Sequence, residues 1–257
     1  MKKVESQIFS NYVRYADTIE FGKVYPLSIA EKVQNGDIFT NTLSDHQTIL
    51  FWHYSGFAFL SGKYDKSFLE FVYKLMLNKS SEISRRFILF VNNKHIEEFF
   101  HTKDNIVVER RYFFEYLKEC HIVNPVLPVG YELREIDAEL LPKIKGKIVP
   151  AFSWHDSREF LSKGKGYCIT NGNEIAAWAF SAAISSKEID IGIETNAEYR
   201  NHGFATIVAK KMIQYILAEN KIPVWACHYK NSASKKLAEK VGFIKTSECS
   251  IIKIKET

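Results

Sequence analysis

The sequence is poor in cysteine, and its cysteines form neither a metal-binding nor a redox pattern. The thiols stand far apart, without a C-x-x-C pair and without histidines at zinc spacing. His95 and His101 would lie on different faces of a helix, because six residues separate them. We therefore expect no bound metal and reduced, mostly buried thiols at Cys120, Cys168, Cys227 and Cys249.

Long apolar runs are also missing. The first twenty residues are basic at their start but contain no continuous apolar stretch of the kind found in signal peptides. No later segment approaches the roughly 20 apolar residues that a membrane-spanning helix needs. The sequence therefore predicts a cytoplasmic protein with no membrane partner.

The chain lacks a dense basic segment as well. Residues 1–127 carry 16 basic and 15 acidic side chains, and residues 128–257 carry 19 basic and 15 acidic ones. Nucleic-acid-binding domains usually gather much more positive charge on one face. The formal net charge of +5 therefore argues against a nucleic-acid partner and favours a modest attraction for an anionic small molecule.

What the sequence does contain is two stretches of regular pattern, separated by a segment with Pro125, Pro128 and Gly130. A chain of 257 residues can bury a large core without help from disulfides or metals. We predict an N-terminal mixed α/β domain over residues 1–127 and a second domain over residues 128–257.

The first of these domains mixes strand and helix signals. The segment 105–117 fits either state. Strands are predicted at 48–62 and 85–93, and helices at 66–77 and 94–100.

The second domain has a clearer order of elements. Three antiparallel strands are expected, with Asn171 and Gly172 at the first turn, and from Phe204 the apolar residues follow the 3.6-residue period of a helix. A buried strand, a helix closed by Gly242 and closing strands follow, so a parallel crossover joins a largely antiparallel sheet. The predicted strands lie at 131–136, 166–170, 174–184, 188–195, 222–228 and 243–254, with helical or broken-helical signals at 137–152 and 157–164.

The segment YRNHGFAT, residues 199–206, leads from a strand into this helix and is suited to a phosphate group. The first amides of a helix lack backbone acceptors and attract anions. Gly203 allows a ligand to approach the backbone, and Arg200 can add a bidentate donor. A plain tight turn with a surface arginine is the alternative. The tripeptide from Gly56 to Ala58 repeats the glycine motif without that arginine or a following helix, so the context decides the meaning.

Two motifs together resemble the GNAT superfamily of N-acetyltransferases. The segment from Arg200 to Ala205 is similar to the family's acyl-CoA signature, Arg/Gln-x-x-Gly-x-Gly/Ala. About 26 residues later, NSASKKLAEKVGF is similar to its second motif, at Asn231, Ser234, Lys240, Gly242 and Phe243. The resemblance covers roughly residues 128–257 and implies a GNAT acetyltransferase fold there. It leaves the first domain unexplained, but the alternating strands and helices of that domain and its similar length permit a degenerate GNAT-like lobe, which would wall off the acceptor site or form a homodimer contact.

This resemblance implies that acetyl-CoA is the cosubstrate. The amides after Arg200 would hold its diphosphate, and its pantetheine arm would lie between two parting strands. Lys210 or Lys211 could reach a further phosphate, or could lie on a solvated helix face. The residues implied in cosubstrate binding are Ile193, Thr195, Arg200, Asn201, His202, Gly203, Phe204, Ala205, Thr206, Asn231 and Ser234.

Acetyl transfer to an amine also requires a proton acceptor, because an alkylammonium has a pKa of about 10. In many GNAT enzymes a carboxylate on the strand before the signature serves, which singles out Glu188, Asp190 and Glu194. We favour Glu194 as the proton acceptor. The alternative for each of the three is that it is a solvent-facing polar residue of a half-exposed strand. A β-bulge in this strand would change which of them share a face.

The family's usual general acid, a tyrosine of the second motif, is replaced by Ala238. A CoA thiolate, with a thiol pKa of about 8.5, can leave without being protonated, so we expect direct attack by the amine. Cys227, His228 or Tyr229 could replace the acid or be purely structural. The loss of the tyrosine also favours a second function, that of an acyl-CoA-binding sensor without turnover.

The acceptor is less well defined by the sequence. The combination of IGIET, YRNHGFAT and VWACHYKNSAS is similar to a subgroup that includes zwittermicin-resistance acetyltransferases, which implies a small acceptor with a primary amine. Trp154 and His155 fall where the family's acceptor-side helices occur. They would line the acceptor pocket or, alternatively, be a core tryptophan and a surface histidine.

Overall fold

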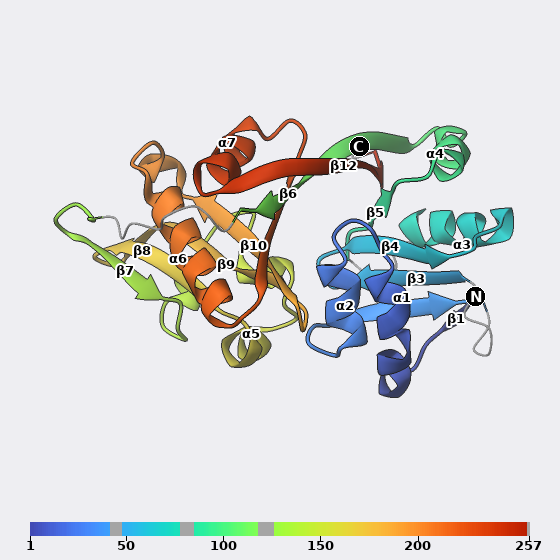
Figure 1. Ribbon diagram of the computed structural model, residues 1–257, viewed down its shortest axis with the longest axis horizontal. Helices are drawn as coiled ribbons and strands as arrows, with labels where there is room; N and C mark the ends of the chain where they lie inside the picture. Colours follow the sequence, from blue (N-terminus) through green and yellow to red (C-terminus); the bar gives the residue numbers. More distant parts are fainter. Residues whose placement is uncertain (42–47, 78–84, 118–125, 256–257) are drawn as a thin grey trace. The chain divides into compact units, whose positions relative to one another are not determined.

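A computed structural model of the chain describes residues 1–41, 48–77, 85–117 and 126–255. They form two compact units, Met1–Tyr112 with Ser247–Thr257 and Phe113–Thr246 (Figure 1). The predicted domain boundary at residue 127 falls inside the second unit. The division lies elsewhere because two long strands, β6 (Ile106–Tyr116) and β12 (Phe243–Ile254), have residues in both units.

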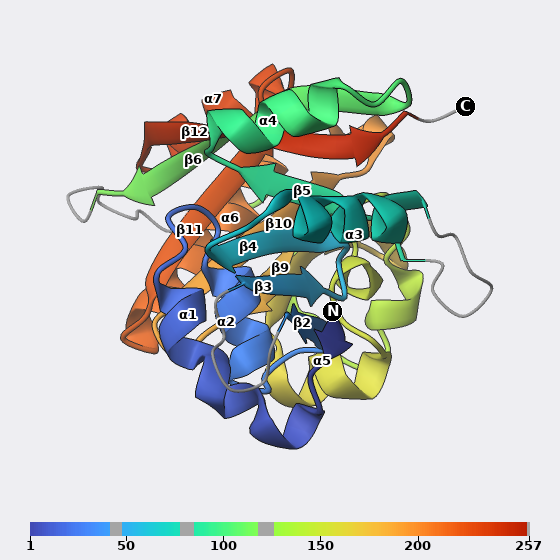
Figure 2. The same ribbon diagram turned by 90° about the vertical axis from the view of Figure 1, so that its right-hand side faces the viewer.

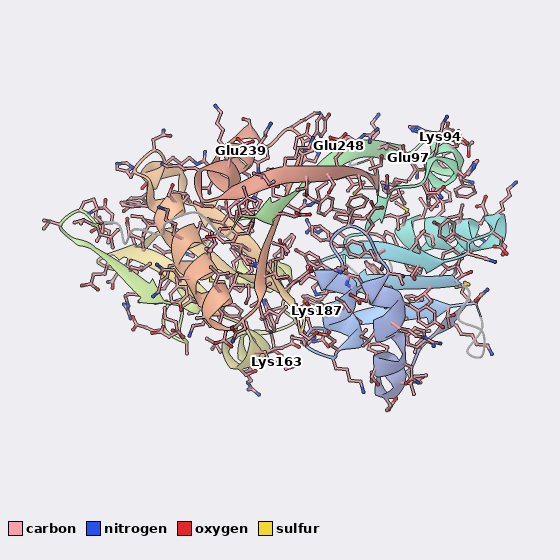
Figure 3. All side chains as sticks on the ribbon, viewed as in Figure 1. Lys94, Glu97, Lys163, Lys187, Glu239 and Glu248 are labelled. Carbon is pink, nitrogen blue, oxygen red and sulfur yellow. The ribbon has the colours of Figure 1, made fainter. Side chains whose placement is uncertain are left out.

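The first unit contains a sheet with the strand order β1-β2-β3-β4-β5-β12. The pairs described are antiparallel, except that β4 and β5 are parallel. The C-terminal strand belongs here because Ser250 to Ile252 pair with β5. The Ser250 hydroxyl also donates over 2.8 Å to Glu97 of α4 (Lys94–His101), and Figure 3 labels Glu97 on this helix. The bounds are β1 (Lys2–Lys3), β2 (Gly36–Thr40), β3 (Thr48–His53), β4 (Phe57–Gly62) and β5 (Ile88–Val91).

Helices cover both faces of this sheet, which explains why β3 is buried along its whole length (Figure 2). Side chains of a strand alternate between the two faces. Leu50 and Trp52 join the cluster formed with α3 and α4, whereas Phe57 and Phe59 contact Tyr25 of α2. The helices are η1 (Ser6–Tyr12), α1 (Val13–Asp17), α2 (Val24–Ala30), α3 (Lys66–Leu77) and α4 (Lys94–His101).

The second unit has the strand order β11-β10-β9-β8-β7, antiparallel except for the parallel pair β10 and β11. The predicted strands and the turn at Gly172, with a φ of 57°, are present. The helical signal over 137–152 yields only short 3-10 turns, because prolines stand at Pro142 and Pro150. The bounds are β7 (Tyr131–Glu135), η2 (Leu141–Lys143), η3 (Pro150–Phe152), α5 (Ser157–Lys163), β8 (Gly166–Asn171), β9 (Glu174–Ile184), β10 (Glu188–Thr195), η4 (Ala197–Tyr199), α6 (Phe204–Ala218), β11 (Ile222–His228) and α7 (Ser232–Lys240).

The two units repeat one order of elements. Three antiparallel strands are followed by a helix, a parallel strand, a second helix and a long strand, as β2-β3-β4-α3-β5-α4-β6 and as β8-β9-β10-α6-β11-α7-β12. An asparagine side chain caps the second helix in both, Asn93 at α4 and Asn231 at α7. The first half therefore contains a degenerate copy of the fold in the second half.

Candidate functional site

The start of α6 exposes backbone amides that have no acceptor. Gly203 is the N-cap residue with a φ of 80°, and its carbonyl accepts from the amides of Thr206 and Ile207. Within the described residues, the amides of Gly203, Phe204 and Ala205 donate to no acceptor. A Cβ at Gly203 would meet nothing within 4 Å. Glycine is thus required for its backbone angle, and the space in front of the helix is open.

Side chains around this opening hold the loop in place but leave its arginine exposed. The His202 ring stacks on buried Phe204, with centroids 5.6 Å apart, and its Nδ1 lies 2.8 Å from the Arg200 carbonyl oxygen. The Arg200 guanidinium forms no hydrogen bond or ion pair in the described part of the chain. Lys211 lies over the Tyr167 ring at 5.4 Å, so it contacts β8. The opening therefore combines free amides with the exposed cation of Arg200.

The matching helix of the first unit gives an internal comparison. At α3, Asp65 accepts from the amide of Phe68 over 2.8 Å and from the hydroxyl of Ser67 over 3.0 Å, and these bonds lower its pKa. A carboxylate of the protein thus occupies the place where an anion could bind. Gly56 has a φ of 86° but precedes β4, and a Cβ there would collide with Arg86. Only the second glycine motif opens a helix towards solvent.

The strands on either side of this helix part as the resemblance implies. β10 pairs with β11 only from Glu188 to Asp190, opposite Ile222 to Val224. From Ile191 to Thr195 it pairs with β9 alone. The strands thus separate towards the end where α6 begins, and Ile193 and Thr195 lie half-buried at this edge.

The three candidate carboxylates do not form one group. Glu188 and Asp190 lie in the paired part of β10, and Asp190 is only 6% exposed. Glu194 lies in the parted segment, about 20 Å from Glu188 along a strand that rises about 3.3 Å per residue. A register shift between Asp190 and Ile191 separates the two parts. Only Glu194 stands where the strands open.

Glu194 has a structural contact that the sequence did not predict. Its Oε2 accepts from the amides of Lys147 and Ile148 over 2.8 and 2.7 Å. The Trp178 indole donates to the Ile148 carbonyl over 2.7 Å, and a Cβ at Gly146 would collide with both Glu194 and Trp178. Among the described residues, Glu194 Oε1 receives no hydrogen bond. The carboxylate thus anchors the loop before η3 and keeps one oxygen available. Gly146 was the sequence signal for this close packing.

The second motif forms the start of α7. Asn231 Oδ1 accepts from the Ser234 amide over 3.0 Å, and Ser234 Oγ accepts from the Trp225 indole over 3.1 Å. Ala238 is fully buried. Tyr229, which precedes this helix, is 37% exposed.

A cavity of about 390 Å³ lies between the 3-10 turns and α5 of the second unit. Trp154 and His155 both line it. Trp154 is a core residue, 1% exposed, whose indole donates to the Ser181 carbonyl over 2.8 Å, whereas His155 is exposed. Ile144 and Val149 line the same cavity on either side of the loop that Glu194 holds.

Cys168, Cys227 and Cys249, the cysteines of the described residues, are buried and form no disulfide, and Cys120 lies outside those residues. Burial raises the pKa of Cys168 to about 11 and that of Cys249 to about 12, so neither is an activated nucleophile. The described residues contain no group of three metal-ligating side chains. In the same residues, no helix has the length and apolarity to cross a bilayer.

Comparison with known proteins identifies relatives over most of the chain. A family model described as GNAT acetyltransferase matches residues 24–252. The chain is 25% identical over 229 residues to "Uncharacterized N-acetyltransferase YdfB" of Bacillus subtilis (strain 168), covering 87% of each protein. A GCN5-related N-acetyltransferase-like protein from Streptococcus suis 89/1591 has a TM-score of 0.77 at 20% identity, over 98% of this chain and 100% of that one. A tandem GNAT protein from the clavulanic acid biosynthesis pathway has a TM-score of 0.63 at 10% identity, over 98% and 97%.

Proposed function

Because the chain belongs to the GNAT acetyltransferase family and is an N-acetyltransferase by that membership, we propose that it moves an acetyl group from acetyl-CoA to the primary amine of a small molecule. The observation that carries the choice of cosubstrate is the start of α6. Its amides have no acceptor among the described residues, and Arg200 is available beside them. Such a cradle suits the diphosphate of a CoA ester.

The parted strands supply the rest of the cosubstrate site. An arm with amide groups fits against the edge of β10 between Ile191 and Thr195, where β11 no longer pairs. The amide nitrogen of Asn231 is the proposed partner for this arm, since its Oδ1 already caps α7. When bound, acetyl-CoA supplies a thioester whose carbonyl an amine can attack.

Glu194 is the proposed base. It lies in the parted segment, and Oε2 is held by two amides while Oε1 can accept a proton from the amine, directly or through water. Glu188 and Asp190 are less suitable because they lie in the paired segment. A backbone amide at the open edge of β10 would stabilise the oxyanion formed during direct attack.

The cavity of about 390 Å³ is the proposed acceptor pocket. Trp154 and His155 line it, and Glu194 fixes the loop beside its wall. Its size is that of a small-molecule site. This supports the small amino-bearing acceptor that the resemblance to zwittermicin-resistance acetyltransferases implies.

The cosubstrate is tested by thermal unfolding with acetyl-CoA. A ligand present at 100 times its Kd stabilises the folded state by about 2.7 kcal/mol. We expect a rise in Tm for the natural protein and none for Gly203→Glu. The backbone at this position has a positive φ, which disfavours glutamate, and the new carboxylate brings a negative charge to the phosphate position. Gly172→Glu, at a positive φ in an exposed turn, is the matched control and should keep the rise. An unchanged Tm for the natural protein would contradict acetyl-CoA binding.

A sensor without turnover is the second candidate. It is favoured because the buried Ala238 stands where the family usually has the tyrosine that acts as general acid. A thiol-release assay with acetyl-CoA and a panel of primary amines separates the two. Release that depends on an amine supports the enzyme and identifies its acceptor. Acetyl-CoA binding without release from any amine of a broad panel supports the sensor.

A further inference from the structure

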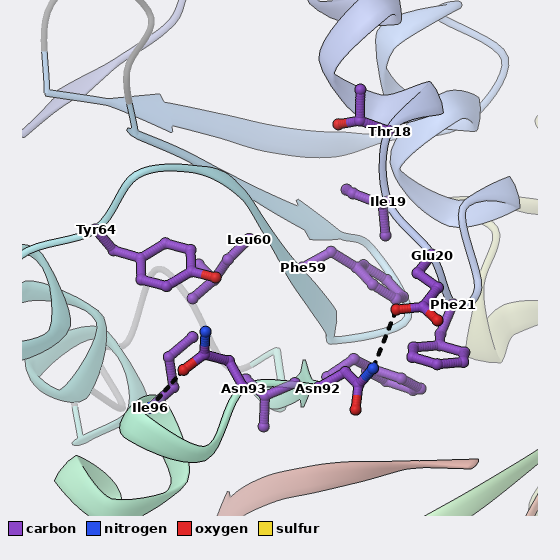
Figure 4. Close-up of a pocket in the computed structure, with 12 residues that line it drawn as sticks. Thr18, Ile19, Glu20, Phe21, Phe59, Leu60, Tyr64, Asn92, Asn93 and Ile96 are labelled. Carbon is purple, nitrogen blue, oxygen red and sulfur yellow. Dashed lines mark hydrogen bonds between the residues drawn. The ribbon is translucent and has the colours of Figure 1, made fainter. Parts of the chain in front are cut away.

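The first unit contains a cavity of its own, of about 180 Å³ (Figure 4). It lies at the ends of β4 and β5, which pair only from Phe57 to Phe59 opposite Ile88 to Phe90. In the structural repeat, these strands correspond to β10 and β11. The cavity is therefore the first unit's counterpart of the parted strands, yet its lining has a different chemistry.

Its floor is apolar and aromatic. Phe59 and Phe90 stack with ring centroids 4.7 Å apart, and Val91 and Ile96 are buried beside them. An apolar cavity of about 150 Å³ is large enough for benzene. The volume here therefore suits one ring or a short branched chain with a small head group.

Its rim carries a carboxylate. Glu20 lies in the connection between α1 and α2. Its carboxylate accepts from the side-chain amide of Asn92 over 3.0 Å, and this bond holds the Glu20 side chain across the mouth of the cavity. Figure 4 shows the Glu20 carboxylate next to the rings of Phe21 and Phe59. A carboxylate beside aromatic rings attracts a cation, through charge-assisted hydrogen bonds and through the ring faces.

The same unit is unsuited to the diphosphate of a CoA ester. Asp65 already accepts from the Phe68 amide and the Ser67 hydroxyl at the start of α3, and its carboxylate would repel a phosphate. Only residues 63–65 connect β4 with α3, whereas residues 196–203 connect β10 with α6. A ligand of this cavity is therefore smaller than a CoA ester, and the Glu20 carboxylate in the lining disfavours an anion.

We propose that the cavity of the first unit binds a small primary ammonium compound with an aromatic or branched apolar body. The ammonium group donates to Glu20, and the apolar body lies against Phe59 and Phe90. This site is separate from acetyl transfer and does not rest on it. It gives the degenerate unit a ligand of its own.

The test is calorimetric titration of the full chain with three probes of similar shape. They are 2-phenylethylamine, the neutral 2-phenylethanol and the anionic 3-phenylpropanoate. We expect the amine to bind at least about threefold more tightly than the alcohol, and the acid most weakly, because only the amine pairs with an exposed carboxylate. Equal binding of amine and alcohol, or binding of none, overturns the proposal.

Glu20→Gln keeps an acceptor for Asn92 and removes the charge, so it should reduce amine affinity to that of the alcohol. Glu98→Gln, on α4 with Lys94 and His95 as partners, is the matched control and should leave the affinity unchanged. Gly203→Glu should bind the amine as the natural protein does, so failure of the acetyl-CoA site and failure of this site can be told apart. An unchanged amine affinity in Glu20→Gln would also overturn the proposal.

Discussion

His53 gives a prediction about stability and pH. It ends β3 fully buried, and its Nδ1 accepts from the Ser55 amide over 3.0 Å, so Nε2 carries the hydrogen. Nε2 has no hydrogen-bond partner among the described residues, and the ring lies edge-on to Tyr25 with centroids 5.0 Å apart. Burial, and then the charge of Arg85, lower the pKa of His53 from 6.5 to about 3.

The sign of the effect follows from proton binding. Below pH 6.5 the unfolded chain binds a proton at this imidazole, whereas the folded chain does not until the pH approaches 3. His53 therefore lowers the free energy of unfolding as the pH falls from about 6.5 to about 3, and has no such effect at higher pH. At 1.36 kcal/mol per pH unit, the loss at pH 5 is about 2 kcal/mol.

The assay is urea unfolding at pH 7 and pH 5, with hydrogen exchange of β3 amides as the readout for the first unit. His53→Asn keeps an acceptor near the Ser55 amide but cannot titrate. Its loss of stability between pH 7 and pH 5 should be about 2 kcal/mol smaller than that of the natural protein. His101→Asn, at an exposed position on α4, is the control and should keep the natural difference. An equal pH effect in His53→Asn and the natural protein would refute the reasoning.

Three further predictions concern the second unit. Glu194→Gln retains an acceptor for the amides of Lys147 and Ile148, so the fold should persist while kcat for amine acetylation falls by about 100-fold or more. The control Glu188→Gln should change kcat little. A kcat retained in Glu194→Gln would exclude Glu194 as the base. Asn231→Ala removes the cap of α7 and should cost about 1 kcal/mol in urea unfolding, with Asn196→Ala, which caps no helix by its side chain, as the neutral comparison. Cys168 and Cys249 should resist a thiol reagent at pH 8 until the chain unfolds, because burial raises the pKa of both; rapid labelling of the folded protein at either residue would contradict that burial.

The second half of the fold was predictable because its local signals agree with one another. Asn171 and Gly172 mark a tight turn, Phe204 begins a helical period, and Gly242 follows a helix end with a φ of 103°. Local sequence also distinguished the two glycine motifs, since only Gly203 is followed by a helix. The segment 105–117 was ambiguous because its many apolar and aromatic residues fit either state, and it forms a strand.

Long-range pairing was not predictable from the sequence. The predicted boundary near residue 127 differs from the observed division because the pairing of Ser250 with Val91 joins residues far apart in the chain. The structural repeat was also not readable from the sequence, because it consists of the order of the elements and of the corresponding helix caps, Asn93 and Asn231. The contact between Glu194 and the Lys147 amide likewise depends on tertiary packing, so the sequence indicated the carboxylate but not its role as an anchor.

The pairing of β12 with β5 has a consequence for synthesis of the protein. The edge of β5 that receives residues 250–252 stays open until these residues have left the ribosome. An open strand edge next to apolar residues is prone to pair with other chains. The amino-terminal half, although translated first, can therefore complete its sheet only after residues 250–252 have been made, and a premature stop before residue 250 should leave an aggregation-prone product.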